Sequence, residues 1–288
     1  MTRLTAFVVL VPLAFRPQSP PEPEPLRLEK NARIVLLGGG AGARMIHFGH
    51  FETEIHLRHP DHHLVVRNMC DEGATPSFRP HSARKNQLGF PGAEKFVLRY
   101  CDGRLAPGEG FFPSEEEWLA QLKPDLLIGF FGWNESFQGM AGLEPFREEL
   151  DAFVRHTLAQ KYNGAAPPRL VLVSPTAIQD LSGALDVPDG KAHNPVLAAY
   201  TSVLEAVAQK HGVLFVDAFH TSQAWYRESK APLTIDGVLL NEAGDRKLGE
   251  FLAERLFGPA PAAAGRYRDL VRRAVLEKDW MWMNDFKI

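Results

Sequence analysis

Short apolar segments alternate with longer helical patterns along most of this 288-residue chain, and that alternation limits the folds open to it. Five of the segments are short β-type runs, and the first, 33–37, is a continuous apolar run stopped by glycines, which suits a buried parallel strand. Strands that alternate with helices build a parallel sheet with helices on both faces. The sequence therefore predicts an α/β fold, a three-layer α/β/α sandwich around a five-stranded parallel sheet. The predicted strands are 33–37, 64–67, 125–131, 169–174 and 213–217.

Six helices are expected between and after these strands. Ser114 followed by Glu117 has the spacing of a capping box, in which each residue satisfies a main-chain N–H group of the other's turn. The tryptophans near the end of the chain are expected to dock the last helix on the core. The predicted helices are 44–58, 114–122, 143–162, 196–211, 241–257 and 266–283.

The N-terminus has the pattern of an export signal. Arg3 precedes the apolar run 4–15, which is shorter than the roughly 20 residues that span a bilayer, and a proline-rich stretch follows at 16–25. We expect a signal peptide and an exported protein, periplasmic or secreted, without a stable membrane span. A disordered or wrongly assigned N-terminus is the alternative, because no A-x-A-like cleavage site follows the run. The expected organisation is a signal peptide at 1–15, a linker at 16–30, the α/β domain at 31–258 and a C-terminal helical extension at 259–288.

The net charge limits the kinds of partner that the chain can bind, and the cysteine content limits its possible disulfides. The formal net charge is −3 without a basic block, which argues against a nucleic-acid partner. Cys70 and Cys101 are the two cysteines of the chain. In an exported protein they could form a disulfide, and two buried thiols are the alternative.

Ligands of parallel sheets bind outside the carboxyl ends of the strands, so the segments that follow the strands are the candidate site. Gly38, Gly39 and Gly40 follow the first strand and precede a helix, where glycine lets main-chain N–H groups approach a ligand. The same run fits the G-x-G-x-x-A pattern of dinucleotide-binding domains loosely. A nicotinamide nucleotide-binding Rossmann domain is therefore an alternative, although Arg67-Asn68 stands where its acidic residue is expected.

Three further segments complete a pattern. Gly73 follows the second strand, Gly132 and Asn134 follow the third, and Asp236 opens the run DGVLLNEAG before the helix at 241–257. In order and spacing the four segments resemble the conserved blocks of the SGNH/GDSL hydrolase family. The resemblance covers about residues 33–257 and implies a flavodoxin-like strand order 2-1-3-4-5. The runs FFGWNESF at 130–137 and LAQKYNG at 158–164 are similar to those of exported bacterial members.

Two departures from the family pattern bear on function. The position of the nucleophilic serine is occupied by Gly40, and that of the histidine by Leu239. Ester hydrolysis in this family needs a hydroxyl activated by an imidazole that a carboxylate orients. The ordinary serine–histidine mechanism is therefore not available to this chain.

The resemblance implies that the groups that bind the substrate oxygen remain. These are the N–H groups of Gly40 and Gly73 and the side-chain amide of Asn134, with Gly38, Gly39 and Trp133 as further ligand contacts. The implied ligand is a small acyl or acetyl ester or a carbohydrate, with no metal and no cofactor. The chain is expected to be an impaired esterase or a non-catalytic binding module.

Two other routes to hydrolysis remain open. Glu135 and Asp236 could together activate a water molecule. Cys70 could act with a histidine such as His47, His50 or His193, although the neighbouring Asp71 and Glu72 disfavour a reactive thiolate.

Overall fold

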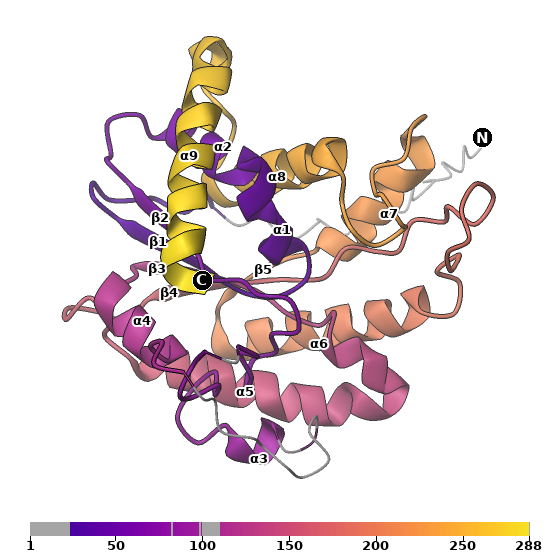
Figure 1. Cartoon of the computed structure of the whole chain (residues 1–288), viewed down its shortest axis with the longest axis horizontal. Coiled ribbons are helices and arrows are strands. Elements are labelled where there is room, and N and C mark those ends of the chain that lie inside the picture. Colours follow the sequence, from indigo (N-terminus) through magenta and orange to yellow (C-terminus); the bar gives the residue numbers. More distant parts are fainter. Residues whose placement is uncertain (1–23, 82, 98, 100–109, 288) are drawn as a thin grey trace, which may run out of the picture.

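The computed structural model describes residues 24–81, 83–97, 99 and 110–287. The predicted signal peptide, most of the linker and Cys101 lie outside these residues, and so does the disulfide proposed for Cys70 and Cys101. Within the described residues, five parallel strands form one sheet in the order β2-β1-β3-β4-β5, as predicted (Figure 1). The strands are β1 Arg33–Gly38, β2 Val65–Asn68, β3 Leu126–Phe130, β4 Arg169–Val173 and β5 Leu214–Val216.

Helices cover both faces of the sheet and make it the middle of three layers. In Figure 1, α4, α5 and α6 lie below the sheet, and α1, α2 and α8 lie above it. Inside the described range, the helices are α1 Ala41–Phe48, α2 His50–Arg58, α3 Glu94–Val97, α4 Glu115–Leu122, α5 Leu143–Ala159, α6 Asn194–His211, α7 Ala218–Glu228, α8 Glu242–Phe257 and α9 Arg268–Lys287, with 3₁₀ turns η1 Glu135–Gly142 and η2 Ala262–Tyr267.

Side chains at alternate positions of the central strands pack into two hydrophobic cores, one on each face of the sheet. On β1, Val35 and Leu37 pack with α5 and α6, whereas Ile34 and Leu36 pack with α1, α2 and α8. Because both faces of a parallel sheet are buried, its central strands need apolar residues along most of their length. This requirement explains the unbroken apolar runs at 34–37 and 126–128, whereas the edge strand β2 ends in Arg67 and Asn68.

Several helical segments differ from the sequence prediction, among them the short helix α3, which was not predicted. The helix expected at 44–58 is broken at Gly49, whose φ of 67° ends α1 and begins α2. A Cβ atom there would lie 3.0 Å from Val275 Cγ1, so α9 packs directly against the break. Helix α7 was not predicted, although Asp217 caps it by accepting a 2.9 Å hydrogen bond from the His220 N–H group.

The predicted capping box of α4 is present. The Ser114 hydroxyl accepts a hydrogen bond from Glu117 N, and the Glu117 carboxylate accepts one of 2.7 Å from Ser114 N. These bonds satisfy main-chain donors that an uncapped helix would leave to water. They define the residue at which the long connection after β2 ends and α4 begins.

The C-terminal helix α9 lies along the β2 edge of the sheet (Figure 1). The Trp282 indole donates a 2.7 Å hydrogen bond to the Asn68 carbonyl, and Lys278 Nζ lies 3.3 Å from the Val66 carbonyl. Trp282 and Phe286 are buried, whereas Trp280 is 66% exposed. The expectation that C-terminal aromatic residues dock the last helix is therefore confirmed for Trp282.

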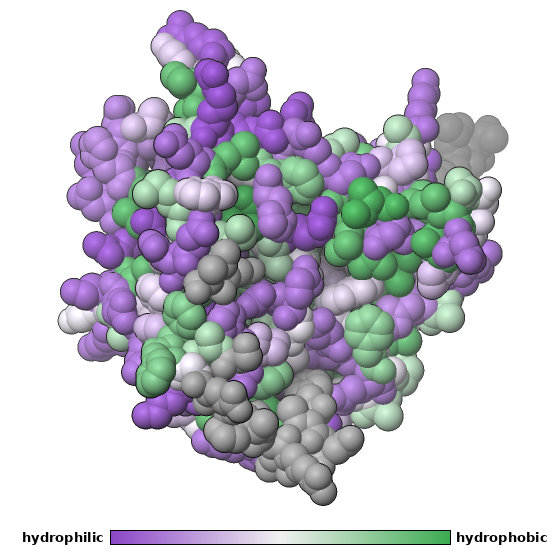
Figure 2. Space-filling view, in the orientation of Figure 1, coloured by the Kyte–Doolittle hydropathy of each residue, from purple (hydrophilic) through white to green (hydrophobic). Residues whose placement is uncertain are grey.

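The surface in this view is mostly hydrophilic, and apolar residues gather over the region of α7 (Figure 2). None of the helices in the described part of the chain is long and apolar enough to cross a membrane.

Candidate functional site

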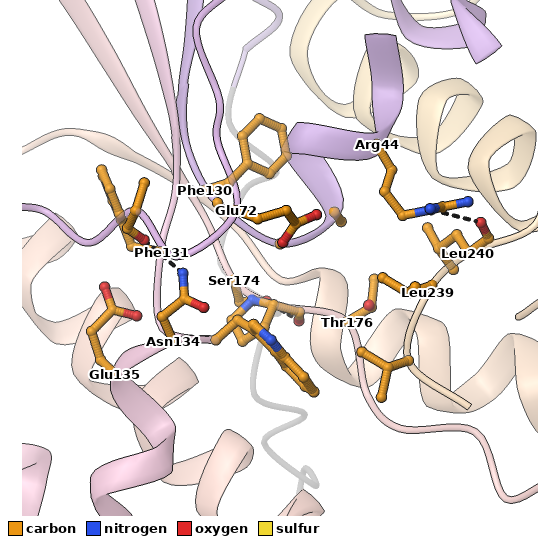
Figure 3. Close-up of a pocket in the computed structure, with 17 residues that line it drawn as sticks. Arg44, Glu72, Phe130, Phe131, Asn134, Glu135, Ser174, Thr176, Leu239 and Leu240 are labelled. Atoms are coloured by element: carbon orange, nitrogen blue, oxygen red, sulfur yellow. Dashed lines mark hydrogen bonds between the residues drawn. The ribbon is translucent and has the colours of Figure 1, made fainter. Parts of the chain in front are cut away.

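A small cavity lies at the carboxyl end of the sheet, where the four segments singled out in the sequence come together (Figure 3). Its volume is about 40 Å³. On this measure a water molecule needs roughly 10–15 Å³, so the cavity has room for about three or four non-hydrogen atoms. The lining residues are Gly39, Gly40, Ala41, Arg44, Glu72, Ala74, Phe130, Phe131, Trp133, Asn134, Glu135, Ser174, Pro175, Thr176, Val238, Leu239 and Leu240.

The turn after β1 brings its main chain against β3. Gly38 has a φ of 105°, and a Cβ atom there would lie 2.1 Å from the Phe130 carbonyl oxygen. Gly39 donates a 3.0 Å hydrogen bond to the same carbonyl, and a Cβ on Gly39 would lie 2.8 Å from Asn134 Nδ2. The close Phe130 main chain therefore requires glycine at position 38, and the close Asn134 side chain favours glycine at position 39. Gly38 shapes the turn but does not line the cavity.

Gly40 stands at the start of α1 with a φ of 55° and a ψ of −128°. A Cβ atom there would meet Trp133 Cβ at 3.5 Å, which is an ordinary contact. Space for a side chain is therefore present, and the cost of adding one comes from the main-chain conformation. Gly40, the N-cap residue of α1, makes no side-chain hydrogen bond to the helix, and both Gly40 and Ala41 line the cavity.

Asn134 joins the segment after β3 to the segment after β2. Its Nδ2 donates a 2.8 Å hydrogen bond to the Ala74 carbonyl. This bond uses one of the two hydrogens of the amide, which leaves the other able to serve a ligand. Gly73 is exposed and has a φ of 78°, and its neighbours Glu72 and Ala74 line the cavity in its place.

Glu135 is the most perturbed acid of the cavity wall. It is 1% exposed, and its Oε2 accepts a 2.8 Å hydrogen bond from Gly132 N. Burial, followed by the nearby charge of Glu149, raises the pKa of Glu135 to about 8. Its Oε1 is also buried and has no hydrogen-bond partner among the described residues. Glu135 is therefore protonated at neutral pH.

Asp236 is held by its own loop. Its Oδ1 accepts hydrogen bonds of 2.9 Å from Val238 N and 2.7 Å from Leu239 N. These bonds place Leu239 in the cavity wall, at the position where the SGNH/GDSL pattern has a histidine. The carboxyl groups of Glu135 and Asp236 thus have different partners, and Asp236 does not line the cavity.

Two charged lining residues, Arg44 and Glu72, were not found from the sequence. Arg44 Nε donates a 3.1 Å hydrogen bond to the Leu240 carbonyl, which joins α1 to the loop before α8. In Figure 3, Arg44 and Leu239 lie on one side, Asn134 and Glu135 lie on the other, and Glu72 lies between them. Both residues are near predicted glycines in the sequence, but only the fold shows that their side chains face the cavity.

The serines near the cavity have other structural roles. Ser174 Oγ accepts hydrogen bonds of 2.9 Å from Ala218 N and 3.0 Å from Phe219 N, so it caps α7. Ser136 Oγ lies 2.8 Å from His193 Nε2, but the hydroxyl donates a 2.6 Å hydrogen bond to the Trp133 carbonyl and is 1% exposed. Neither hydroxyl is placed as a nucleophile in the cavity.

The cysteine alternative loses its basis in the structure. Cys70 is 1% exposed and belongs to the hydrophobic core on the α1 face. His50 is 3% exposed, and its burial, followed by the charge of Arg272, lowers its pKa to about 4. A nucleophile has to reach its substrate, so this buried thiol is better explained as a packing residue.

Comparison with known proteins decides the family. Residues 58–247 match the model of the GDSL-like lipase/acylhydrolase family. The chain belongs to this family. No curated protein has a sequence that matches the chain significantly. Membership of the GDSL-like family leaves the nicotinamide nucleotide alternative without support.

Solved structures of GDSL-like proteins share the fold. A catalytic mutant of an acetylxylan esterase from Geobacillus stearothermophilus is 16% identical and has a TM-score of 0.53, over 81% of this chain and 97% of that one. A GDSL-like lipase from Parabacteroides merdae is 16% identical with a TM-score of 0.56, over 81% and 99%. An α/β hydrolase from a metagenome of Lake Arreo, Spain, is 16% identical with a TM-score of 0.52, over 81% and 98%. At these identities the likeness shows the fold alone.

Proposed function

We propose that this GDSL-family chain binds a small acyl or acetyl ester, or a carbohydrate that carries one, and has at most a strongly impaired esterase activity. The observation that carries the proposal is the pair of residues at the catalytic positions. Gly40 offers no hydroxyl, and Leu239, which lines the cavity, offers no base. The proposal therefore separates ligand binding, which the site retains, from turnover, which it lacks.

The acetylxylan esterase supports this assignment of positions. Its catalytic mutants replace a serine, an aspartate or a histidine by alanine, and the aspartate and histidine stand three positions apart. Asp236 and Leu239 have the same spacing in this chain. By this comparison the chain keeps the aspartate and lacks the histidine, so Asp236 has no imidazole to orient.

The cavity supports a small ligand. Its volume of about 40 Å³ suits an acetyl group rather than a long acyl chain. Asn134 presents a polar group to the cavity, and Trp133 presents an aromatic wall on which a sugar ring could pack. A few polar groups in a largely apolar cavity are the usual composition of a small-molecule site.

Hydrolysis of p-nitrophenyl acetate tests the proposal. The purified chain and its Asn134→Ala variant are compared with buffer, and turnover is measured over a range of substrate concentrations. We expect no saturable turnover beyond a small residue that depends on Asn134, because preorganised donors alone leave roughly 10³–10⁴-fold catalysis over water in enzymes stripped of their triad. Rapid, saturable turnover of the unmodified chain would contradict the proposal.

A further inference from the structure

A large groove lies between helix α9 and the β2 edge of the sheet, beside helix α2 (Figure 1). Its volume is about 750 Å³, within the roughly 300–1,000 Å³ of small-molecule sites. The residues that line it are all different from those that line the cavity at the carboxyl end of the sheet. The groove is therefore a separate candidate site.

One wall of the groove is an apolar stripe of α9. Leu270, Val271, Ala274 and Val275 line the groove at the spacing of one helix face, and Lys278 stands at the end of the stripe. From Leu270 to Lys278 this wall is about 12 Å long, at 1.5 Å per residue. The groove is thus elongated along the axis of the helix.

The opposite side of the groove is also apolar. Leu57, Leu64 and Val66 line it and are buried. Leu270, by contrast, is 61% exposed, so the α9 wall carries apolar surface that water contacts. Covering such surface with a chain of methylene groups is favourable, because apolar area is then removed from water.

The side chain of Arg67 adds a positive charge to one end of this groove. Its Nη1 donates a 2.9 Å hydrogen bond to the Val66 carbonyl, and its guanidinium lies 5.4 Å from the centre of the Trp282 ring. In the described part of the chain, Arg67 forms no ion pair, and its Nε and Nη2 atoms have no hydrogen-bond partner and are not buried. Arg67 and Lys278 also both line the smaller groove beside Trp282, which places Arg67 at the Lys278 end.

The other charged groups at that end bind one another. Lys278 Nζ lies 2.6 Å from Glu52 Oε2 and 3.3 Å from the Val66 carbonyl, and it also donates to Asp279 Oδ1, so its three hydrogens are used. Asp279 is 3% exposed, and its burial, followed by the charge of Glu52, raises its pKa to about 7. Below that pH, Lys278 and Glu52 balance each other and the charge of Arg67 is left uncompensated.

We infer that this groove binds a single-chain amphiphile with a carboxylate head, of the class of a free fatty acid. The carboxylate accepts hydrogen bonds from Nε and Nη2 of Arg67, an arrangement in which a guanidinium binds both carboxylate oxygens at once. The acyl chain lies along the α9 stripe, from Lys278 towards Leu270. This inference goes beyond the proposed function, because the two sites share no residue and either can exist without the other.

The shape and the bonding of the groove favour this occupant over a peptide. An extended peptide would have to pair with the main chain of β2, and the carbonyls of Val66 and Asn68 already accept hydrogen bonds from Lys278 and Trp282. One accessible cation beside a long apolar wall matches one carboxylate with one alkyl chain.

Decanoate, decanol and butyrate provide the test, because decanol keeps the chain without the charge and butyrate keeps the charge with little of the chain. Binding of each to the purified full chain is measured by isothermal titration calorimetry at pH 6.5. We expect decanoate to bind at one site, about tenfold or more tightly than either decanol or butyrate, because only decanoate uses both Arg67 and the apolar wall.

Variants assign the effect to residues. Arg67→Gln should weaken decanoate binding about tenfold and leave decanol binding unchanged. Arg147→Gln, at an exposed arginine of α5, is the matched control that should change neither. Asn134→Ala, in the other cavity, should also leave decanoate binding unchanged.

A second pair of variants leaves Arg67 in place. Ala274 is exposed on the α9 wall, so a longer side chain there need not disturb the core. Ala274→Glu and Ala274→Lys add side chains of similar size and opposite charge beside the expected head group. Ala274→Glu should weaken decanoate binding about tenfold relative to Ala274→Lys, and the two variants should bind decanol equally.

The possible outcomes separate this inference from the proposed function. Decanoate binding that depends on Arg67 and on the charge at position 274 supports the inference. Equal affinity for decanoate and decanol, or decanoate binding that neither set of variants changes, overturns it. A dimer in analytical ultracentrifugation that Ala274→Glu dissociates, without decanoate binding, also overturns it and assigns the groove to a second copy of the chain. None of these results alters ester binding at the cavity, which the Asn134→Ala comparison measures separately.

Discussion

The side-chain amide of Asn134 donates a 2.8 Å hydrogen bond to the main-chain carbonyl of Ala74, so the loops that follow β3 and β2 are tied together at the cavity wall. The same amide lies where a side chain on Gly39 would have to go. The bond therefore has a structural role in addition to any role toward a ligand.

Replacing Asn134 tests both roles. Asn134→Ala should lower the free energy of unfolding by about 1 kcal/mol through loss of this bond and should abolish binding of the proposed ester ligand. Asn134→Asp keeps the shape but sets a carboxylate against the Ala74 carbonyl, so it should be the more destabilising of the two. Urea denaturation of the three proteins measures the order, and an Asp variant as stable as the native chain would contradict it.

Restoring the missing side chains should create activity. Gly40→Ser with Leu239→His should raise p-nitrophenyl acetate hydrolysis at least tenfold over either single change, because members of a triad act as a unit. The structure leaves room for the serine Cβ, and the bonds to the loop N–H groups use only Oδ1 of Asp236. The left-handed φ of Gly40 makes the serine cost about 1–3 kcal/mol of stability. Equal rates for the double and single variants would show that the scaffold is not aligned for catalysis.

Glu135 should make stability fall as the pH rises. Its pKa is raised from 4.5 to about 8, so between these values the folded chain holds a proton that the unfolded chain releases. The folded state is then favoured at the lower pH, and the contribution lost by pH 8 is on the order of a few kcal/mol. Glu135→Gln should flatten this dependence and stabilise the chain above pH 7. Thermal unfolding of both proteins from pH 5 to 9 provides the measurement, and parallel curves would rule out this role.

Gly38 should tolerate no side chain. Gly38→Ala places a Cβ atom 2.1 Å from the Phe130 carbonyl oxygen at a φ of 105°, so β1 and β3 would have to separate. Gly164→Ala is the matched control, since Gly164 has a φ of 78° with no atom within 4 Å of the added Cβ. The control should cost about 1 kcal/mol from main-chain strain, and Gly38→Ala should cost several times more. If Gly38→Ala and Gly164→Ala lowered the free energy of unfolding equally in chemical denaturation, glycine would be required at position 38 by its φ alone and not by the closeness of the Phe130 carbonyl.

Trp282 should anchor α9 more strongly than Trp280 does. Trp282→Phe removes the indole donor and leaves the Asn68 carbonyl without that bond, which should cost about 1–2 kcal/mol. Trp280→Phe changes a residue that is 66% exposed and should have almost no effect. A comparison of the two unfolding midpoints in urea is sufficient, and a larger effect at Trp280 would contradict this docking of the helix.

The strands and their order could be predicted because a parallel sheet leaves a local signature. The segment 34–37 is apolar at every position because both faces of the sheet are buried there, and the glycines that follow it mark the close turn at the carboxyl edge. The four blocks then indicated which strand ends meet, and the cavity contains residues from all of them.

The features that could not be predicted from the sequence depend on contacts between segments far apart in the chain. The break at Gly49 reflects packing of Val275, more than 200 positions later in the chain, against the end of α1. Arg44 enters the cavity wall because the Leu240 carbonyl holds its Nε, and Asp236 leaves it because Val238 and Leu239 occupy its Oδ1. Sequence motifs show which polar residues lie near the strand ends. Whether their side chains point into the cavity is decided by tertiary contacts.

Helix α9 also has a consequence for how copies of this chain can associate. The outer edge of β2 would otherwise present its carbonyl groups to any extended segment, which is how edge strands template aggregation. The side chains of Lys278 and Trp282 already bond to the carbonyls of Val66 and Asn68 on that edge. A second molecule can add a strand there only after the helix has left, so resistance to fibril-like assembly at this edge is set by how firmly α9 is held.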